Sequence, residues 1–366
     1  MSLRGPHESR SLQLPPLSLY VHIPWCVRKC PYCDFNSHAV SEDADFSLYV
    51  AALLKDLAQE LPWVSGRSVG SVFIGGGTPS LLPAGDARTL LDGLHGMLDL
   101  APDCEITLEA NPGASEAARF AAYREAGVNR LSLGVQSLDD AKLAALGRVH
   151  NAQEAIAAIR AARSAGFDNI NLDLMFGLPA QSLAQGLADL EAALRLEPTH
   201  LSWYQLTLEP NTLFYQKPPR LPGDDQLAEL QDSGQAMLEA AGFAQYEISA
   251  YARDGCASRH NLNYWRFGDY LGIGAGAHGK LTKTDGRIVR RWRVRHPRDY
   301  RVGVGAAEGL AGQRDIDSTE IGIEFLMNVL RLNAGVEEDM FSQRTGYQLD
   351  HLNPQLRQAR EKGWLE

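Results

Sequence analysis

Short apolar runs alternate with longer segments of helical periodicity from residue 17 to about residue 250. The long segments carry apolar residues near i, i+3, i+4 and i+7, which predicts amphipathic helices over Phe46–Leu61, Ala87–Leu98, Ser115–Ala126, Ala152–Ala165 and Leu183–Leu194. The short runs predict strands over Leu17–Ile23, Ser71–Gly75, Glu105–Ala110, Arg130–Val135, Asn169–Phe176 and His200–Leu206. This alternation favours an α/β fold with a parallel sheet, arranged as a partial (β/α)6 barrel.

The pattern changes after this alternating region. Phe243–Tyr251 is typical of one more strand, and a Gly-rich and then Arg-rich stretch follows to about residue 301. Helical periodicity returns from Ser318, which predicts a small helical, winged-helix-like domain ending in a short strand. A cluster of glycines between 303 and 312 favours a domain boundary there. We therefore expect an N-terminal tail, a barrel with an extension, and a C-terminal helical domain over residues 1–16, 17–300 and 301–366.

Three cysteines directly follow the first predicted strand. Cys26, Cys30 and Cys33 have the spacing C-x3-C-x2-C. A [4Fe–4S] cube has four irons, and protein thiolates are their usual outer ligands. Three cysteines would hold three irons and leave the fourth open to a small molecule. A structural zinc ion would need a fourth protein ligand, for which His22 and His38 are nearest. A disulfide would leave one cysteine over and require an oxidising compartment.

Polar residues stand at the ends of several predicted strands. Gly75–Pro79, with three consecutive glycines, follows the second strand, and glycine allows the backbone to approach a ligand closely. Glu109, Gln136 and Asp173 stand at or near the ends of the next strands, and Arg148 comes shortly after the fourth. One such carboxylate alone could be paired with an arginine. Because parallel sheets bind ligands at the carboxyl ends of their strands, we expect these side chains to share one cleft.

Together these motifs resemble the radical S-adenosylmethionine (SAM) superfamily, and within it the oxygen-independent coproporphyrinogen III oxidase family. The resemblance covers roughly residues 17–366. It implies a partial (β/α)6 radical SAM barrel, a [4Fe–4S] cluster on the three cysteines, and SAM chelated to the open iron through its amino and carboxylate groups. It also implies SAM contacts at Tyr20, Gly76, Gly77, Thr78, Glu109, Gln136, Arg148 and Asp173.

Two departures from the oxidases are similar to the haem chaperone branch of the family. The oxidases carry a fourth cysteine two residues past the third, where this chain has Phe35, and a long segment before the strand, where only nineteen residues precede Tyr20. The resemblance then implies that the protein binds haem and passes it to haem-requiring acceptor proteins. Oxidative decarboxylation of coproporphyrinogen III is the alternative, so enzymatic activity is left open here.

A histidine motif late in the chain is a candidate for haem binding. His260-Asn-Leu-Asn-Tyr264-Trp265 matches the His-Asn-x-x-Tyr-Trp motif of that branch, which implies haem binding at His260. From the residues alone, a single histidine beside aromatic residues is more often a hydrogen-bonded core residue. Cys256 and His278 are the next candidates for an iron ligand.

Two further segments have a less specific pattern. Gly272–His278 resembles a dinucleotide-binding loop, but no acidic residue follows at the expected spacing, so we expect its glycines to allow close packing near the ligand cleft. Arg290–Arg295 alternates arginine with apolar residues, which favours a solvated edge strand. A contact with a partner or a propionate is the alternative.

Composition narrows the class of partners. The 366 residues include 35 basic and 45 acidic side chains, and the net charge of −10 argues against a nucleic-acid surface over the whole protein. No run of apolar residues approaches the roughly 18 that a membrane helix needs. Five cysteines without an apolar leader predict the reducing cytoplasm. Peripheral membrane association through a partner and a homodimer are both left open.

Overall fold

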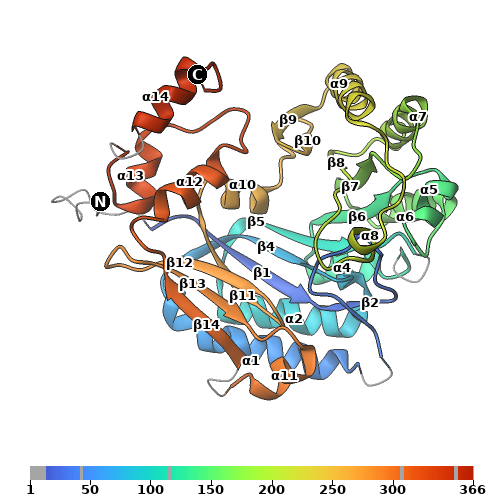
Figure 1. The fold of residues 1–366 in the computed structure, drawn as a ribbon. Helices are drawn as coiled ribbons and strands as arrows, with labels where there is room; N and C mark the ends of the chain where they lie inside the picture. Colours follow the sequence, from blue (N-terminus) through green and yellow to red (C-terminus); the bar gives the residue numbers. More distant parts are fainter. Residues whose placement is uncertain (1–13, 42–43, 114–116, 306–308, 350–352, 366) are drawn as a thin grey trace.

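Six parallel strands form the centre of the computed structural model, which describes residues 14–41, 44–113, 117–305, 309–349 and 353–365. They are neighbours in chain order, and each adjacent pair is parallel: β1 (Leu17–Ile23), β4 (Ser68–Gly76), β5 (Asp99–Ala110), β6 (Arg130–Gln136), β7 (Asn169–Phe176) and β8 (His200–Gln205) (Figure 1). The helices between them include α1 (Phe46–Val64), α2 (Ala84–Met97), α4 (Phe120–Ala126), α6 (Ala152–Ser164) and α7 (Leu183–Leu194). The predicted partial (β/α)6 barrel is confirmed.

Local sequence signals set the ends of these helices. Asp45 caps α1 by accepting a hydrogen bond from the Leu48 backbone N–H at 2.9 Å. Capping boxes begin α6 and α7, as expected where a polar cap precedes Glu or Gln by three residues. Gly127 ends α4 with a φ of 114°, in the left-handed region that favours glycine. The predicted start of α4 at Ser115, like nearly all of the tail 1–16, lies outside the described residues.

The sheet continues beyond β1 on its other side. β11 (Asp269–Ile273) pairs parallel with β1, and the antiparallel strands β12 (His278–Thr282), β13 (Ile288–Arg293) and β14 (Leu310–Asp315) follow. The Arg-rich segment therefore forms an interior strand, and the expectation of a solvated edge strand is wrong. Arg291 and Arg293 are buried because Asp56 and Glu60 of α1 supply carboxylates at 2.7–2.8 Å.

The other edge of the sheet carries a hairpin. The single strand predicted over Phe243–Tyr251 divides into β9 (Ala244–Glu247) and β10 (Ala250–Ala252), which pair antiparallel, and β10 pairs with β8. The Glu247 carboxylate accepts a hydrogen bond at 3.1 Å from the Ser249 backbone N–H within the turn. Next in the chain comes α10 (Arg259–Trp265), which lies against β1, β4 and β11.

The C-terminal part is helical. It contains α12 (Ile321–Val329), α13 (Asp339–Thr345) and α14 (Asn353–Glu361), which lie at the opposite end of the molecule from α5 (Asp140–Ala145) and α7 (Figure 1). Phe267, Ile321, Phe325 and Phe341 form a hydrophobic cluster separate from the barrel core. The sheet itself extends to Asp315, beyond residue 301. Up to Leu365, the part of the chain that is described has no strand after α14, so the expected terminal strand is not found.

Across the described ranges, no helix has the length and apolar character needed to cross a bilayer.

Candidate functional site

The three cysteines lie on the segment that leaves β1. The two-residue strands β2 (Trp25–Cys26) and β3 (His38–Ala39) pair with each other and close a loop over residues 27–37. All three thiols are partly exposed and line one pocket, together with the strand ends described below. The Ser37 hydroxyl lies 3.8 Å from the sulfur of Cys33, and Arg148 Nη1 donates to the sulfur of Cys30 at 3.5 Å. We call this cavity the cysteine pocket.

Burial raises the pKa of the Cys26 and Cys33 thiols, so both hold their protons at neutral pH without a metal. Soft thiolates are the donor set that iron–sulfur clusters require, and metal binding would displace those protons. No three His, Cys, Asp or Glu side chains of the described residues are placed to hold a single metal ion. Ligands of one zinc ion all lie about 2.0–2.3 Å from it, whereas cluster ligands bind separate irons. Three thiols that line one pocket suit a cluster with one open iron, whereas a closed structural zinc site needs four protein ligands.

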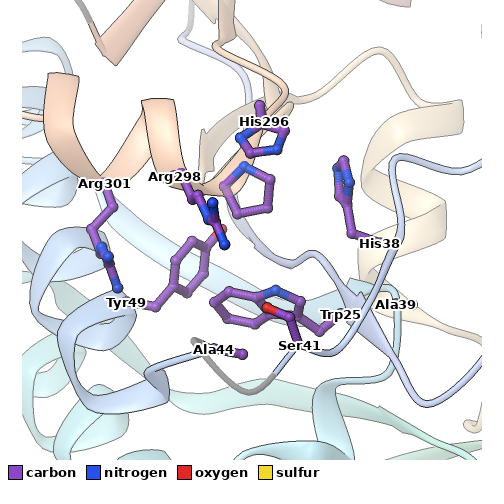
Figure 2. A pocket seen from close by; sticks show the side chains of 10 residues that line it. Trp25, His38, Ala39, Ser41, Ala44, Tyr49, His296, Arg298 and Arg301 are labelled. Atoms are coloured by element: carbon purple, nitrogen blue, oxygen red, sulfur yellow. The ribbon is translucent and has the colours of Figure 1, made fainter.

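His38, considered as a zinc ligand, points into a different cavity. Figure 2 shows His38 beside His296, with Trp25 and Tyr49 below them in that view. The two imidazole rings are 5.5 Å apart and meet edge to face. His22, the other candidate, has both ring nitrogens engaged, one with the Tyr20 hydroxyl and one with the Asn36 carbonyl.

The glycine loop packs directly on the cysteine segment. The backbone N–H groups of Gly77 and Thr78 donate to the carbonyls of Ile23 and Trp25, each at 2.7 Å. A Cβ at Gly77 would lie 2.5 Å from the Trp25 carbonyl oxygen, and one at Gly76 would lie 2.6 Å from the His22 ring. The sequence predicts that these glycines allow the backbone to approach a ligand closely. The structure shows that two of them are required for packing.

The predicted strand-end residues converge on the cysteine pocket. Its walls include the three cysteines together with Gly76, Gly77, Thr78, Glu109, Gln136, Arg148 and Asp173. Seven of the eight residues that the resemblance assigns to SAM therefore share one cavity with the proposed cluster ligands. Tyr20, the eighth, faces the adjoining pocket described below.

The two carboxyl groups of the pocket are held in contrasting ways. Glu109 Oε2 accepts from the Gly76 backbone N–H at 3.0 Å, and burial, followed by the charge of Asp173, raises its pKa to about 8. Asp173 accepts from Asn171 Nδ2 at 2.8 Å and from the Ser132 hydroxyl at 3.4 Å, and burial raises its pKa as well. A cationic ligand in this cavity would favour the ionised form of both groups.

The polar groups opposite are fixed by the sheet. Gln136 has a φ of 66°, and its side-chain oxygen accepts from the Tyr204 hydroxyl at 2.7 Å. Arg148 Nη2 donates to the Gly134 carbonyl at 2.8 Å and to Asn111 Oδ1 at 2.5 Å. Sequence reasoning missed Asn111 and Tyr204 as pocket residues. Both stand at the ends of predicted strands, so the rule that found Glu109 could also have found them.

A second cavity adjoins the first. Tyr20, Phe35, Tyr264, Tyr270, His278 and Arg295 are among its walls, and it shares Phe35, Gly76 and Glu109 with the cysteine pocket. We call it the aromatic pocket. Burial, followed by the charges of Arg290 and Arg295, lowers the pKa of His278.

His260 does not line either pocket among the described wall residues. Its side chain is buried, with 3% exposed. Its ring stacks on that of Phe73 and meets that of Tyr264 edge to face, with ring centres 4.8 and 4.7 Å apart. Burial and the charge of Arg130 lower its pKa to about 3, and its Nδ1 has no hydrogen-bond partner in the described structure. The structure therefore places the predicted haem ligand within the protein core.

Comparison with known proteins fits this geometry. Residues 20–196 match the radical SAM superfamily, and residues 316–366 match the HemN C-terminal domain. A protein of Escherichia coli named heme chaperone HemW is 53% identical over 354 residues, which cover 97% of this chain and 93% of that protein. The chain belongs to the HemW family. A HemW of Bacillus subtilis is 39% identical, with 95% of this chain and 92% of the relative covered.

The fold is shared more widely than the sequence. Coproporphyrinogen III oxidase (HemN) from Escherichia coli, a radical SAM enzyme, superposes with a TM-score of 0.81 over 96% of this chain and 83% of its own. Its identity to this HemW family member is only 23%. Use of a [4Fe–4S] cluster and SAM is typical of the radical SAM superfamily.

Proposed function

We propose that this protein is a haem chaperone, which binds haem, SAM and a [4Fe–4S] cluster and delivers the haem to acceptor proteins. The observation that carries the proposal is the 53% identity, over 93% of its length, to a protein named heme chaperone. The cysteine pocket and the aromatic pocket supply two adjoining cavities of different chemistry, which suits a protein that holds a cluster and a planar ligand together.

Cys26, Cys30 and Cys33 are the proposed cluster ligands. Phe35, the residue that replaces the fourth cysteine of the oxidases, is 64% exposed and lies between the two pockets. An apolar side chain there adds surface for a planar ligand and offers no fourth thiolate. A cluster held in this way would supply an open iron for SAM and, when reduced, an electron.

Residues of the cysteine pocket, together with Tyr20 of the aromatic pocket, would position SAM. Tyr20, Gly76, Gly77, Thr78, Glu109, Gln136, Arg148 and Asp173 are the proposed contacts. Once ionised, Asp173 and Glu109 would supply negative charge to a sulfonium cation in this cavity, because an opposite charge nearby favours the charged form of a carboxyl group. The Tyr204 hydroxyl and the strained backbone at Gln136 hold the Gln136 amide toward the same cavity.

Haem transfer is the direct test of this function. Anaerobically purified protein with a reconstituted cluster is loaded with haem, separated from free haem, and mixed with an apo-haem protein. We expect the acceptor to gain its holo spectrum faster than from buffer alone, in proportion to the loaded chaperone. Transfer no faster than from a haem-loaded serum albumin control would contradict the proposal.

The oxidase is the competing function, supported here by fold alone. With SAM, a reductant and coproporphyrinogen III, we expect no protoporphyrinogen IX. Turnover comparable to that of Escherichia coli HemN in the same assay would restore the oxidase. The reducing cytoplasm is the proposed location, and membrane association through a partner and a homodimer stay predictions.

A further inference from the structure

We propose that His278, rather than His260, is the haem iron ligand, with Arg295 as the partner of a haem propionate in the aromatic pocket. This inference rests on the proposed function and names the residues that carry it. The walls of this pocket include residues of β1, the loop that carries the cysteines, α10, β11 and the start of β12, together with Arg295 just after β13. These walls bring aromatic rings, one exposed imidazole and one exposed guanidinium together.

His278 is the histidine of this pocket with free ring nitrogens. Its side chain is exposed, its ring stacks on Trp292 with the ring planes 22° apart, and neither nitrogen has a hydrogen-bond partner among the residues the structure describes. His22, the other imidazole of the pocket, has both nitrogens bonded to Tyr20 and Asn36 at 2.8 and 2.9 Å. A neutral imidazole nitrogen with no protein partner is what iron ligation needs.

His260 has a different role in the same region. Its neighbour Glu105 accepts hydrogen bonds from the backbone N–H groups of Arg259 and His260, which fix the start of α10. The His260 ring then packs between Phe73 and Tyr264. Tyr264 in turn lines the aromatic pocket, where the centre of its ring lies 4.2 Å from the centre of the Tyr270 ring. We therefore assign His260 as a positioning residue, which supports the pocket wall through Tyr264.

Arg295 provides the charge that a haem needs. Its backbone carbonyl accepts from Asn36 Nδ2 at 2.8 Å, which fixes the chain beside the pocket. In the described structure its guanidinium makes no ion pair, in contrast to Arg290, Arg291 and Arg293 of the preceding strand. An unpaired guanidinium at the edge of an aromatic cavity can bind a carboxylate through two parallel hydrogen bonds.

The test is a ferric haem titration of full-length, cluster-loaded protein, followed by the Soret band and by electron paramagnetic resonance. His278→Ala should remove the imidazole signature and weaken haem binding by more than about tenfold, and added imidazole should restore the signature. His278→Tyr should replace it with that of a phenolate-ligated iron. Arg295→Gln should weaken binding and keep the signature.

The controls separate ligand from support. His260→Ala should weaken haem binding by about tenfold but keep the imidazole signature, as expected for a supporting residue. Exposed His95 on α2 gives a matched variant, His95→Ala, with wild-type behaviour. Circular dichroism and the cluster absorbance check the fold. If His278→Ala and His278→Tyr keep the wild-type signature and affinity, His278 is not the iron ligand, and the proposed function still stands. If the wild-type protein shows no saturable haem binding, both the ligand assignment and the proposed function are wrong.

Discussion

The cysteine pocket and the aromatic pocket share a wall but are built by different means. The first gathers residues from the ends of β4–β7 and the loop after β1, so consecutive parts of the barrel supply it. The second joins β1 to α10, β12 and the segment after β13, which lie about 250 residues further along the chain. A pocket whose residues follow consecutive strands can be predicted from sequence. A pocket that needs the chain to pair with the same sheet again much later in the sequence cannot.

The strongest test of this contrast removes one cluster ligand. Cys30→Ala should abolish the cluster's visible absorption and most of the bound iron after anaerobic reconstitution, because no other thiol replaces Cys30. Haem should still bind at one per chain, since the aromatic pocket contains no cysteine among its described walls. Cys256→Ala is the matched control and should retain full iron. A complete cluster in Cys30→Ala would contradict the ligand assignment.

The next prediction concerns SAM. Asp173→Ala and Gln136→Ala should each reduce SAM affinity about tenfold to hundredfold, because a hydrogen bond to a charged ligand contributes roughly 1.5–3 kcal/mol. Equilibrium dialysis of cluster-loaded protein measures this. Haem affinity should stay unchanged in both variants. Wild-type SAM affinity in both would remove these residues from the binding site.

A smaller effect is expected where the glycine loop meets the cysteine segment. Gly77→Ala should destabilise the protein by about 1–3 kcal/mol, because its Cβ would overlap the Trp25 carbonyl and the backbone must shift. Gly85→Ala is the matched control, since nothing lies within 4 Å of a Cβ there and the site is in the first turn of α2. Urea unfolding compares the two. Equal stability of both variants would refute the packing role of Gly77.

The mildest prediction concerns the shared wall residue Glu109, whose pKa is raised to about 8 from 4.5. At pH 7 the free site mostly holds Glu109 protonated, and a cationic ligand favours its carboxylate. SAM binding should therefore release a proton, and affinity should rise with pH, by less than about tenfold per unit, and level off above about pH 8. Calorimetry in buffers of different ionisation enthalpy measures the proton. In Glu109→Gln the release should vanish, and its persistence would assign the proton elsewhere.

The sequence predicts the barrel well because its helices and strands are long, regular and clearly capped. It also predicts the cysteine pocket, since strand order places Glu109, Gln136 and Asp173 at one edge. It fails where long-range pairing decides. The pattern at Arg291 and Arg293 predicts a solvated edge strand, because the sequence does not show that Asp56 and Glu60 of α1 pair with them. The strand predicted over Phe243–Tyr251 is divided by a turn that Glu247 stabilises.

The histidine motif shows the same limit most clearly. Spacing identifies the segment around His260, but not which side of α10 faces a cavity. The structure buries His260 against Phe73 and turns Tyr264 toward the aromatic pocket. His278, which carries a free imidazole at that pocket, stands in a glycine-rich segment whose pattern favours close packing, so the sequence makes it only a secondary candidate for an iron ligand.

Haem titration of the wild-type protein is the decisive measurement, because a haem chaperone must bind haem at a defined site. Cluster-loaded, anaerobic protein is titrated with ferric haem while the Soret band is recorded against a matched blank. We expect a shifted band that saturates at one haem per chain and is unaffected by Cys30→Ala. A Soret change that grows linearly with added haem, without saturation, would contradict a defined haem site.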